Sequence, residues 1–173
     1  VLPSPAYLNG HVRPTPETMS KLLALMRRMF DYVIVDAGQS TNDTTLKVLE
    51  ISDTLLLVPI LSLPCLANAN KMIKSLTDLG YVPNERIRVV LNRHIRKGDI
   101  SIEDAEAGLG KKLFCTIPND FTATMAAINN GKPLLEIAPK ADISKSLVEL
   151  ASMLMKTGEA AAGGAKKKLP LFN

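Results

Sequence analysis

The chain has 173 residues, of which 46% are hydrophobic, so it is long enough and apolar enough to bury a sizeable core as one domain. Its formal charge is +4, but Lys166, Lys167 and Lys168 supply three of these charges and the rest is close to neutral. A near-neutral body argues against a dedicated nucleic-acid surface. No stretch is apolar for long enough to span a membrane and no signal peptide opens the chain, so we expect a cytoplasmic location.

The two cysteines give no sign of a disulfide or a zinc site. Cys65 and Cys115 are far apart in the sequence, and neither belongs to a Cys-x-x-Cys or Cys/His pattern. We therefore expect both to behave as small buried hydrophobic residues in a reducing compartment.

The first third of the chain predicts a helix followed by a strand. Thr15 is a suitable N-cap and Pro16 suits the first helical position. The apolar run that follows, Phe30–Val35, is typical of a strand buried on both faces, and the ionised Asp36 should emerge at its carboxyl end. Two interpretations of Asp36 remain open: a carboxylate at the ligand-binding edge of a sheet, or, together with Ser40, the N-cap of the next helix.

The remaining sequence alternates helices with strands. We predict strands over Thr54–Pro59, Ile87–Leu91 and Leu113–Ile117, and helices over 46–51, 66–76, from Ser101 to Gly108 or Leu109, from Asp120 to Gly131, and from Asp142 onward with Leu147 facing inward. This alternation predicts an α/β fold with a mostly parallel sheet and helices on both faces. The folded part should extend over residues 1–157, and residues 158–173 should form a disordered basic tail.

Polar residues follow each of three predicted strands. They are Asp36, Asn92-Arg93 and Pro118-Asn119-Asp120. Because the carboxyl ends of parallel strands share one edge of a sheet, these residues predict a ligand-binding rim. Simpler interpretations exist for two of them: Asn92-Arg93 as a strand-end turn with Asn in left-handed geometry, and Asp120 as a helix N-cap, which we favour for Asp120.

Four motifs in this order give the chain a family resemblance. They are Phe30–Asp36, Leu91-Asn92-Arg93, Ile117-Pro118-Asn119-Asp120 and Ala127–Leu134 (A-I-N-N-G-K-P-L). Over about residues 15 to 155 the sequence resembles the MinD/ParA group of deviant P-loop ATPases, and within it the CpaE/TadZ branch of Flp (type IVb) pilus assembly. The resemblance implies an ATPase that dimerises around its nucleotide and helps to place a pilus machine at a cell pole or membrane.

The resemblance also implies roles for particular residues. Asp36 would be the Walker B carboxylate, which acts on Mg²⁺ through water. Asn92 would hydrogen-bond the edge of the adenine of ATP or ADP, since a side-chain amide both donates and accepts. Arg93 would lie beside the base, and Pro118 with Asn119 would form the opposite wall.

The sequence departs from the family pattern at the phosphate loop. No Gly-rich loop followed by Lys-Ser or Lys-Thr is present; the nearest string, Gly108–Lys112, lacks the hydroxyl residue and precedes a strand, whereas a phosphate loop follows one. In the family this loop precedes the Walker B strand. We therefore expect either that the chain is part of a longer protein or that the loop has been lost, and we expect no nucleotide to bind to this chain alone.

Three classes of function are consistent with the sequence. The first is a CpaE/TadZ-like ATPase that forms a homodimer and works with pilus or secretion proteins. The second is a ParA/MinD-type partitioning or positioning ATPase, and the third is a non-catalytic scaffold that keeps the fold. The tail, with Lys166–Lys168 before Leu169–Phe172, leads us to expect at most a weak membrane association, at the inner membrane or a cell pole.

Overall fold

The computed structural model describes residues 14–161, apart from residue 97. The chain divides into two compact units, one made of Val1–Leu55 and Ile73–Ile87 (unit 1) and the other of Leu56–Met72 and Arg88–Asn173 (unit 2). Within the described residues, no helix combines the length and the apolar character that crossing a membrane requires.

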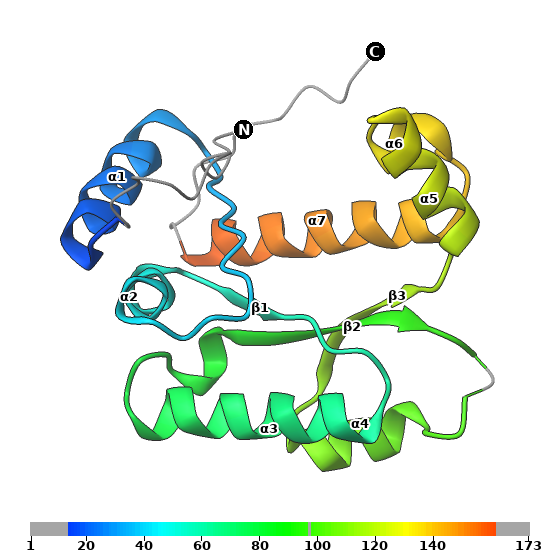
Figure 1. The fold of residues 1–173 in the computed structure, drawn as a ribbon, viewed down its shortest axis with the longest axis horizontal. Helices are drawn as coiled ribbons and strands as arrows, with labels where there is room; N and C mark the ends of the chain where they lie inside the picture. The colour runs from blue at the N-terminus through cyan, green and yellow to red at the C-terminus, as the bar shows by residue number, and fades with distance from the viewer. Residues whose placement is uncertain (1–13, 97, 162–173) are drawn as a thin grey trace, which may run out of the picture. The chain divides into compact units, whose positions relative to one another are not determined.

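From α2 to α5 the described helices alternate with the strands β1, β2 and β3, as the sequence predicts (Figure 1). The three strands form one sheet in the order β1-β2-β3, and β2 runs parallel to β3. In chain order the elements are α1 (Pro16–Met29), α2 (Asp43–Ile51), β1 (Leu55–Leu57), α3 (Leu63–Asp78), the 3-10 helix η1 (Asn84–Arg86), β2 (Ile87–His94), α4 (Ile102–Leu109), β3 (Leu113–Pro118), α5 (Phe121–Asn130), α6 (Leu134–Ile137) and α7 (Asp142–Ala161).

Unit 2 is built around β2 and β3. Val89 and Leu91 of β2 are fully buried, because helices cover the strands on both sides: α7 packs against β3, and α4 lies across the strands from α7 (Figure 1). The predicted parallel sheet with helices on both faces is therefore confirmed in this unit. Its core cluster consists of Val90, Ile117 and Ile143, surrounded by the partly buried Leu56, Phe114, Cys115, Ala123, Leu134, Ala141 and Leu150.

Unit 1 contains the packed pair of helices α1 and α2. The predicted start of α1 is confirmed: the Thr15 hydroxyl accepts a hydrogen bond from the Thr18 N–H at 3.2 Å. For α2 the N-cap is Asn42, whose Oδ1 accepts from the Thr45 N–H at 2.9 Å. The interpretation of Asp36 or Ser40 as the cap of this helix is therefore wrong, because the helix begins later than either residue.

The strand predicted over Phe30–Val35 is not formed. The segment has no regular secondary structure, and Ile34 is 94% exposed, with Tyr32 at 51% and Phe30 at 55%. A buried strand needs backbone partners along its edges and packed layers over its faces. No described strand pairs with this segment, so its apolar composition alone does not produce a buried strand.

Several boundaries also differ from the sequence-based expectation. β1 ends at Leu57, before Pro59, which has no N–H to donate to a neighbouring strand. α7 continues past position 158 to Ala161, and Leu147, which we expected to face inward, is 36% exposed. The short helix α6 after Pro133 was not foreseen. The basic tail, with Lys166–Lys168, lies outside the described residues.

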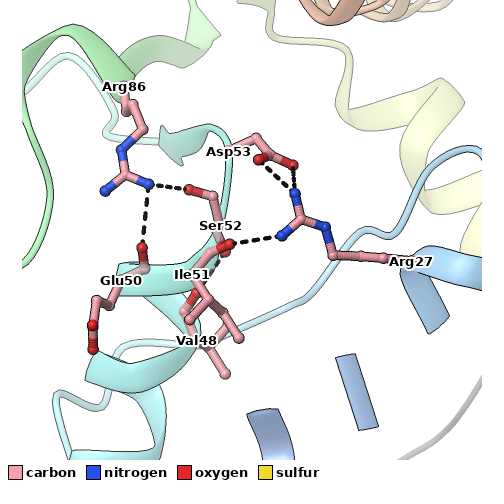
Figure 2. Close-up of polar contacts among 7 residues, drawn as sticks. All are labelled: Arg27, Val48, Glu50, Ile51, Ser52, Asp53 and Arg86. Atoms are coloured by element: carbon pink, nitrogen blue, oxygen red, sulfur yellow. Dashed lines mark hydrogen bonds and ion pairs between the residues drawn. The ribbon is translucent and has the colours of Figure 1, made fainter. Parts of the chain in front are cut away.

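Two arginines hold the end of α2 in unit 1 (Figure 2). Arg86 donates from Nη1 to the carbonyl oxygens of Ser52 at 2.8 Å and of Glu50 at 3.2 Å. Arg27 of α1 donates to both carboxylate oxygens of Asp53, at 2.7 and 2.8 Å, and to the Ile51 carbonyl oxygen at 3.4 Å. The last carbonyl groups of a helix lack partners inside it, and a positive charge there is favourable.

This cluster predicts unequal costs for removing its two cations. Arg86→Met should lower the free energy of unfolding by about 1–3 kcal/mol, because two carbonyl groups lose a charged donor. Arg27→Met should cost less than about 1 kcal/mol, because the ion pair with Asp53 is exposed to water. Urea denaturation of the two variants checks this order, and an equal or larger loss for Arg27→Met would contradict it.

Candidate functional site

The carboxyl ends of β2 and β3 meet at one edge of the sheet in unit 2. His94 of β2 is in register with Pro118 of β3, and the His94 carbonyl oxygen accepts from the Asn119 N–H at 3.0 Å. On the other side, the Asn92 N–H donates to the Pro59 carbonyl oxygen at 2.8 Å. Four of the predicted binding residues (Asn92, Arg93, Pro118 and Asn119) therefore belong to the same edge.

The end of β2 contains a bulge. Two residues of β2, Asn92 and Arg93, stand between Leu91 and His94, whereas only Ile117 of β3 stands between their partners. Arg93 has φ of +52° and is the only described residue other than glycine with a positive φ. Left-handed geometry is unfavourable for arginine, and such exceptions concentrate at binding sites. We had expected Asn92 to adopt this geometry if the pair were a simple turn, and that expectation is wrong.

The side chain of Asn92 holds the bulge in place. Its Oδ1 accepts a hydrogen bond from the Arg93 N–H at 2.9 Å, and the residue is half-buried. This contact engages the amide oxygen and orients the amide group at the edge of the sheet. The Arg93 side chain is exposed, so its guanidinium is accessible to a ligand from solution.

The residues at the end of β3 and directly after it have two different roles. Asp120 is the N-cap of α5, because its Oδ1 accepts from the Ala123 N–H at 2.9 Å, which confirms the favoured interpretation of this residue. Pro118 is half-buried at the strand end, and the Asn119 side chain is exposed. The helix cap thus fixes the direction of the chain beyond Pro118-Asn119 and leaves these two residues at the edge.

Asp36 belongs to unit 1 and follows an extended segment instead of a strand. Its Oδ1 accepts a hydrogen bond from the Gly38 N–H at 3.1 Å, and Gly38 has φ of +63°, which favours glycine. This tight turn fixes one carboxylate oxygen, and the residue as a whole is exposed. Among the described residues, no group of three or more His, Cys, Asp or Glu side chains could hold a metal ion.

Positive charge continues beyond the bulge. Arg96 lies close enough to Asp142, at the start of α7, to contribute to its pKa. That pKa lies below its usual value mainly because Lys145 Nζ donates to Asp142 Oδ1 at 3.0 Å, and the charge of Arg96 adds a smaller effect. Arg93 and Arg96 thus make the end of β2 a cationic part of the edge, suited to an anionic or aromatic ligand.

The string Gly108–Lys112 lies at the opposite end of β3. Gly110 ends α4 in a left-handed conformation, and Lys112 leads directly into β3. A shallow hollow there is lined by Glu103, Glu106, Ala107, Gly110, Lys111 and Lys112. The position before a strand agrees with our conclusion from the sequence that this string is not a phosphate loop.

Comparison with known proteins shows that the chain is similar to ATPases. No protein-family model matches the chain. Over 149 residues it is 25% identical to the septum site-determining protein MinD of Thermotoga maritima, covering 83% of this chain and 54% of that protein. A ParA family ATPase from Chlorobium tepidum superposes with a TM-score of 0.81 at 32% identity, covering 87% of this chain and 62% of that one.

A further solved structure shares the fold. MinD of Pyrococcus horikoshii, complexed with Mg-ADP, superposes on the chain with a TM-score of 0.70 at 20% identity. The match covers 86% of this chain and 60% of the Pyrococcus horikoshii chain. The parallel sheet with its helices is thus of the P-loop NTPase-like class. Sequence relatives and structural neighbours together support the MinD/ParA-type ATPase superfamily. The chain spans only about half the length of the curated relatives it matches.

The left-handed geometry of Arg93 can be tested by measuring the free energy of unfolding of variants at this position. Arg93→Gly should raise the free energy of unfolding by up to about 1 kcal/mol, because glycine adopts a positive φ without strain. Arg93→Val should lower it by about 1 kcal/mol or more, since a β-branched side chain is poorly accommodated there. Urea denaturation of both variants gives the comparison, and a more stable Val variant would show that residue 93 is not held in this geometry.

Proposed function

We propose that the edge formed by β2 and β3 is the base-binding part of a nucleotide site in an ATPase of the MinD/ParA type, with ATP or ADP as ligand. The observation that supports this most directly is the bulge at Asn92-Arg93, which lies at the same sheet edge as Pro118 and Asn119. The similarity to nucleotide-dependent ATPases of the MinD and ParA type agrees with it.

The local contacts indicate how each residue would act on the base. Because Asn92 Oδ1 already accepts from the Arg93 N–H, its Nδ2 group is the part best placed to donate to a ring nitrogen. The exposed guanidinium of Arg93 can lie flat against the base, since a planar cation stacks well on an aromatic face. Pro118 and Asn119 would form the second wall of the slot.

Asp36 suits the role of a magnesium-side carboxylate. Magnesium in nucleotide sites is commonly held by one or two carboxylates, water and phosphate oxygens. The side chain of Asp36 is exposed and turned by its contact with Gly38, so its Oδ2 atom is left to orient a water of the hydrated ion. The bound ion would neutralise the charge that develops on the phosphates. Asp36 would therefore position this water and would not itself attack the nucleotide.

Within the superfamily we propose a CpaE/TadZ-like role in the assembly or placement of Flp pili, with a homodimer as the working form. The order of the four motifs, from Phe30–Asp36 to Ala127–Leu134, supports this branch. A ParA-type partitioning ATPase is the alternative, against which the near-neutral charge outside the tail argues. A non-catalytic scaffold is a second alternative, supported by the absence of a Gly-rich Lys-Ser or Lys-Thr loop from the sequence.

Nucleotide binding provides the central test. Calorimetry with Mg-ATP should show a dissociation constant weaker than about 1 mM for the 173-residue chain, because the amides and lysine of a phosphate loop supply most of the grip on ATP. The native gene product at its full encoded length should bind ATP, and Asn92→Ala should weaken that binding at least about tenfold. Micromolar binding to the 173-residue chain would contradict the first expectation.

Hydrolysis tests Asp36 in the same full-length protein. Asp36→Ala should abolish Mg-dependent turnover, whereas Asp31→Ala, which removes an exposed carboxylate from the other end of the same segment, should leave it intact. Equal turnover in both variants would remove Asp36 from the site. No hydrolysis by the unmodified full-length protein, together with normal dimer formation, would favour the scaffold.

Genetics can distinguish the pilus role from the partitioning role. Deletion of the gene should abolish or misplace Flp pili while plasmid and chromosome segregation stay normal, and the intact gene should restore the pili. A segregation defect with normal pili would favour the ParA-type alternative. Binding of the purified protein to duplex DNA, measured by fluorescence anisotropy at two salt concentrations, gives an independent check of that alternative.

A further inference from the structure

The helix α5 has its small residues on the inside and its large ones on the outside. Ala127 is buried, and Ala123 packs against the core cluster of unit 2. On the opposite side of the helix, Phe121 is 71% exposed and Ile128 64%. These two residues and the half-buried Met125 are spaced by four and three positions, so they share one face. A surface helix normally does the reverse and buries its large apolar residues.

The same helix carries no charge. Among the helices that the structure describes, α5 is the only one without an Asp, Glu, Lys or Arg residue, and its sequence is FTATMAAINN. A helix that is apolar on opposite sides is normally buried on both of them, because neither side is well solvated by water. The outward side, which we call the α5 face (Phe121, Met125 and Ile128), therefore has the character of a contact surface.

The charged residues nearest to α5 in the sequence stand just outside its two ends. Asp120 caps the N-terminus, where its Oδ1 atom accepts a hydrogen bond from the Ala123 N–H at 2.9 Å. Lys132 follows Gly131 beyond the C-terminus and is exposed. The α5 face is thus bordered by a negative charge at one end and a positive charge at the other.

We propose that the α5 face binds the α5 face of a second copy of the chain, with the two helices antiparallel about a two-fold axis near Ala126. In this arrangement Asp120 of each copy lies beside Lys132 of the other, which is attractive, whereas a parallel pair would bring like charges together. Phe121 of each copy lies beside Gly131 of the other, where a Cβ atom would meet no described atom within 4 Å. The two ends of the helix therefore complement each other in charge and in size.

The size of the contact indicates its strength. A helix of ten residues is about 15 Å long, so a pair of α5 helices buries less than the roughly 800 Å² per partner of a standard stable interface. The contact should therefore be weak and reversible, with a dissociation constant of about 10 μM or higher. It involves none of the proposed base-binding residues, so it is separate from a dimer formed around nucleotide. A lipid surface suits the α5 face less well, because helices that lie on membranes carry Lys or Arg beside their apolar face.

Sedimentation equilibrium gives the first test, with the native gene product at its full encoded length and without nucleotide. The unmodified protein should self-associate reversibly as its concentration rises. Ile128→Glu should weaken this association at least about tenfold, because it places a carboxylate from each copy in an apolar contact. Leu79→Glu, at a residue 71% exposed outside α5, is the matched control and should have no effect. No association, or association of equal strength in Ile128→Glu, would overturn the proposal.

A charge reversal tests the antiparallel arrangement in the same experiment. Lys132→Glu should weaken the association at least about threefold, because it sets a second acid beside Asp120 of the other copy. Lys140→Glu makes the same change of charge at an exposed lysine beyond α6 and should leave the association unchanged. Equal weakening by both variants would indicate an effect of net charge alone and would overturn the arrangement that we propose.

Two further outcomes identify other occupants of the α5 face, and either one overturns the proposal. If Ile128→Glu lowers the melting temperature of the dilute, monomeric protein by about 5 °C or more, another segment of the same polypeptide covers this face. If the protein sediments with phospholipid vesicles and Ile128→Glu abolishes this, the face binds lipid. Because all the measurements are made without nucleotide, the proposal can fail while the proposed nucleotide site stands, and the reverse.

Discussion

The backbone pairing of β2 is the interaction on which the organisation of unit 2 depends. β2 is the middle strand of the sheet, so its peptide groups have partners on both sides, and its apolar side chains leave water almost completely, with Val89 and Leu91 fully buried. A peptide group that is buried without a partner is costly, so the central strand determines where its two neighbours must lie. The same ladder brings Pro59 and Asn119 to the end of β2, where the candidate binding residues lie.

The elements that could be predicted from the sequence carry their signals locally. Thr15 caps α1, Ser101 forms a capping box with Asp104 at the start of α4, and Asp120 caps α5, each through a contact three residues along the chain. At the other ends of α4 and α5, Gly110 and Gly131 adopt the left-handed conformation that ends a helix. Because these contacts involve near neighbours in sequence, the residue pattern is sufficient to identify them.

The features that could not be predicted depend on partners distant in the sequence. The apolar character of Phe30–Val35 indicates a strand, but whether it is buried depends on what lies beside it. The bulge at Asn92-Arg93 follows from the register between β2 and β3, which no pattern within β2 reveals. Likewise, Leu147 has the spacing of an inward-facing residue of α7, yet it lies where unit 2 leaves it partly exposed. The common location of Asn92, Arg93, Pro118 and Asn119 could be predicted, because strand ends are local features and neighbouring parallel strands end at the same edge.

The bulge in β2 also determines how the sheet responds to a change in chain length. In a regular strand the loss or gain of one residue reverses every side chain beyond that point, because side chains alternate between the two faces. Between Leu91 and His94 the bulge already supplies one extra residue, so deletion of Arg93 would leave Asn92 alone opposite Ile117 and keep His94 in register with Pro118. The sheet would survive this deletion, whereas the left-handed position that residue 93 occupies at the edge would be lost.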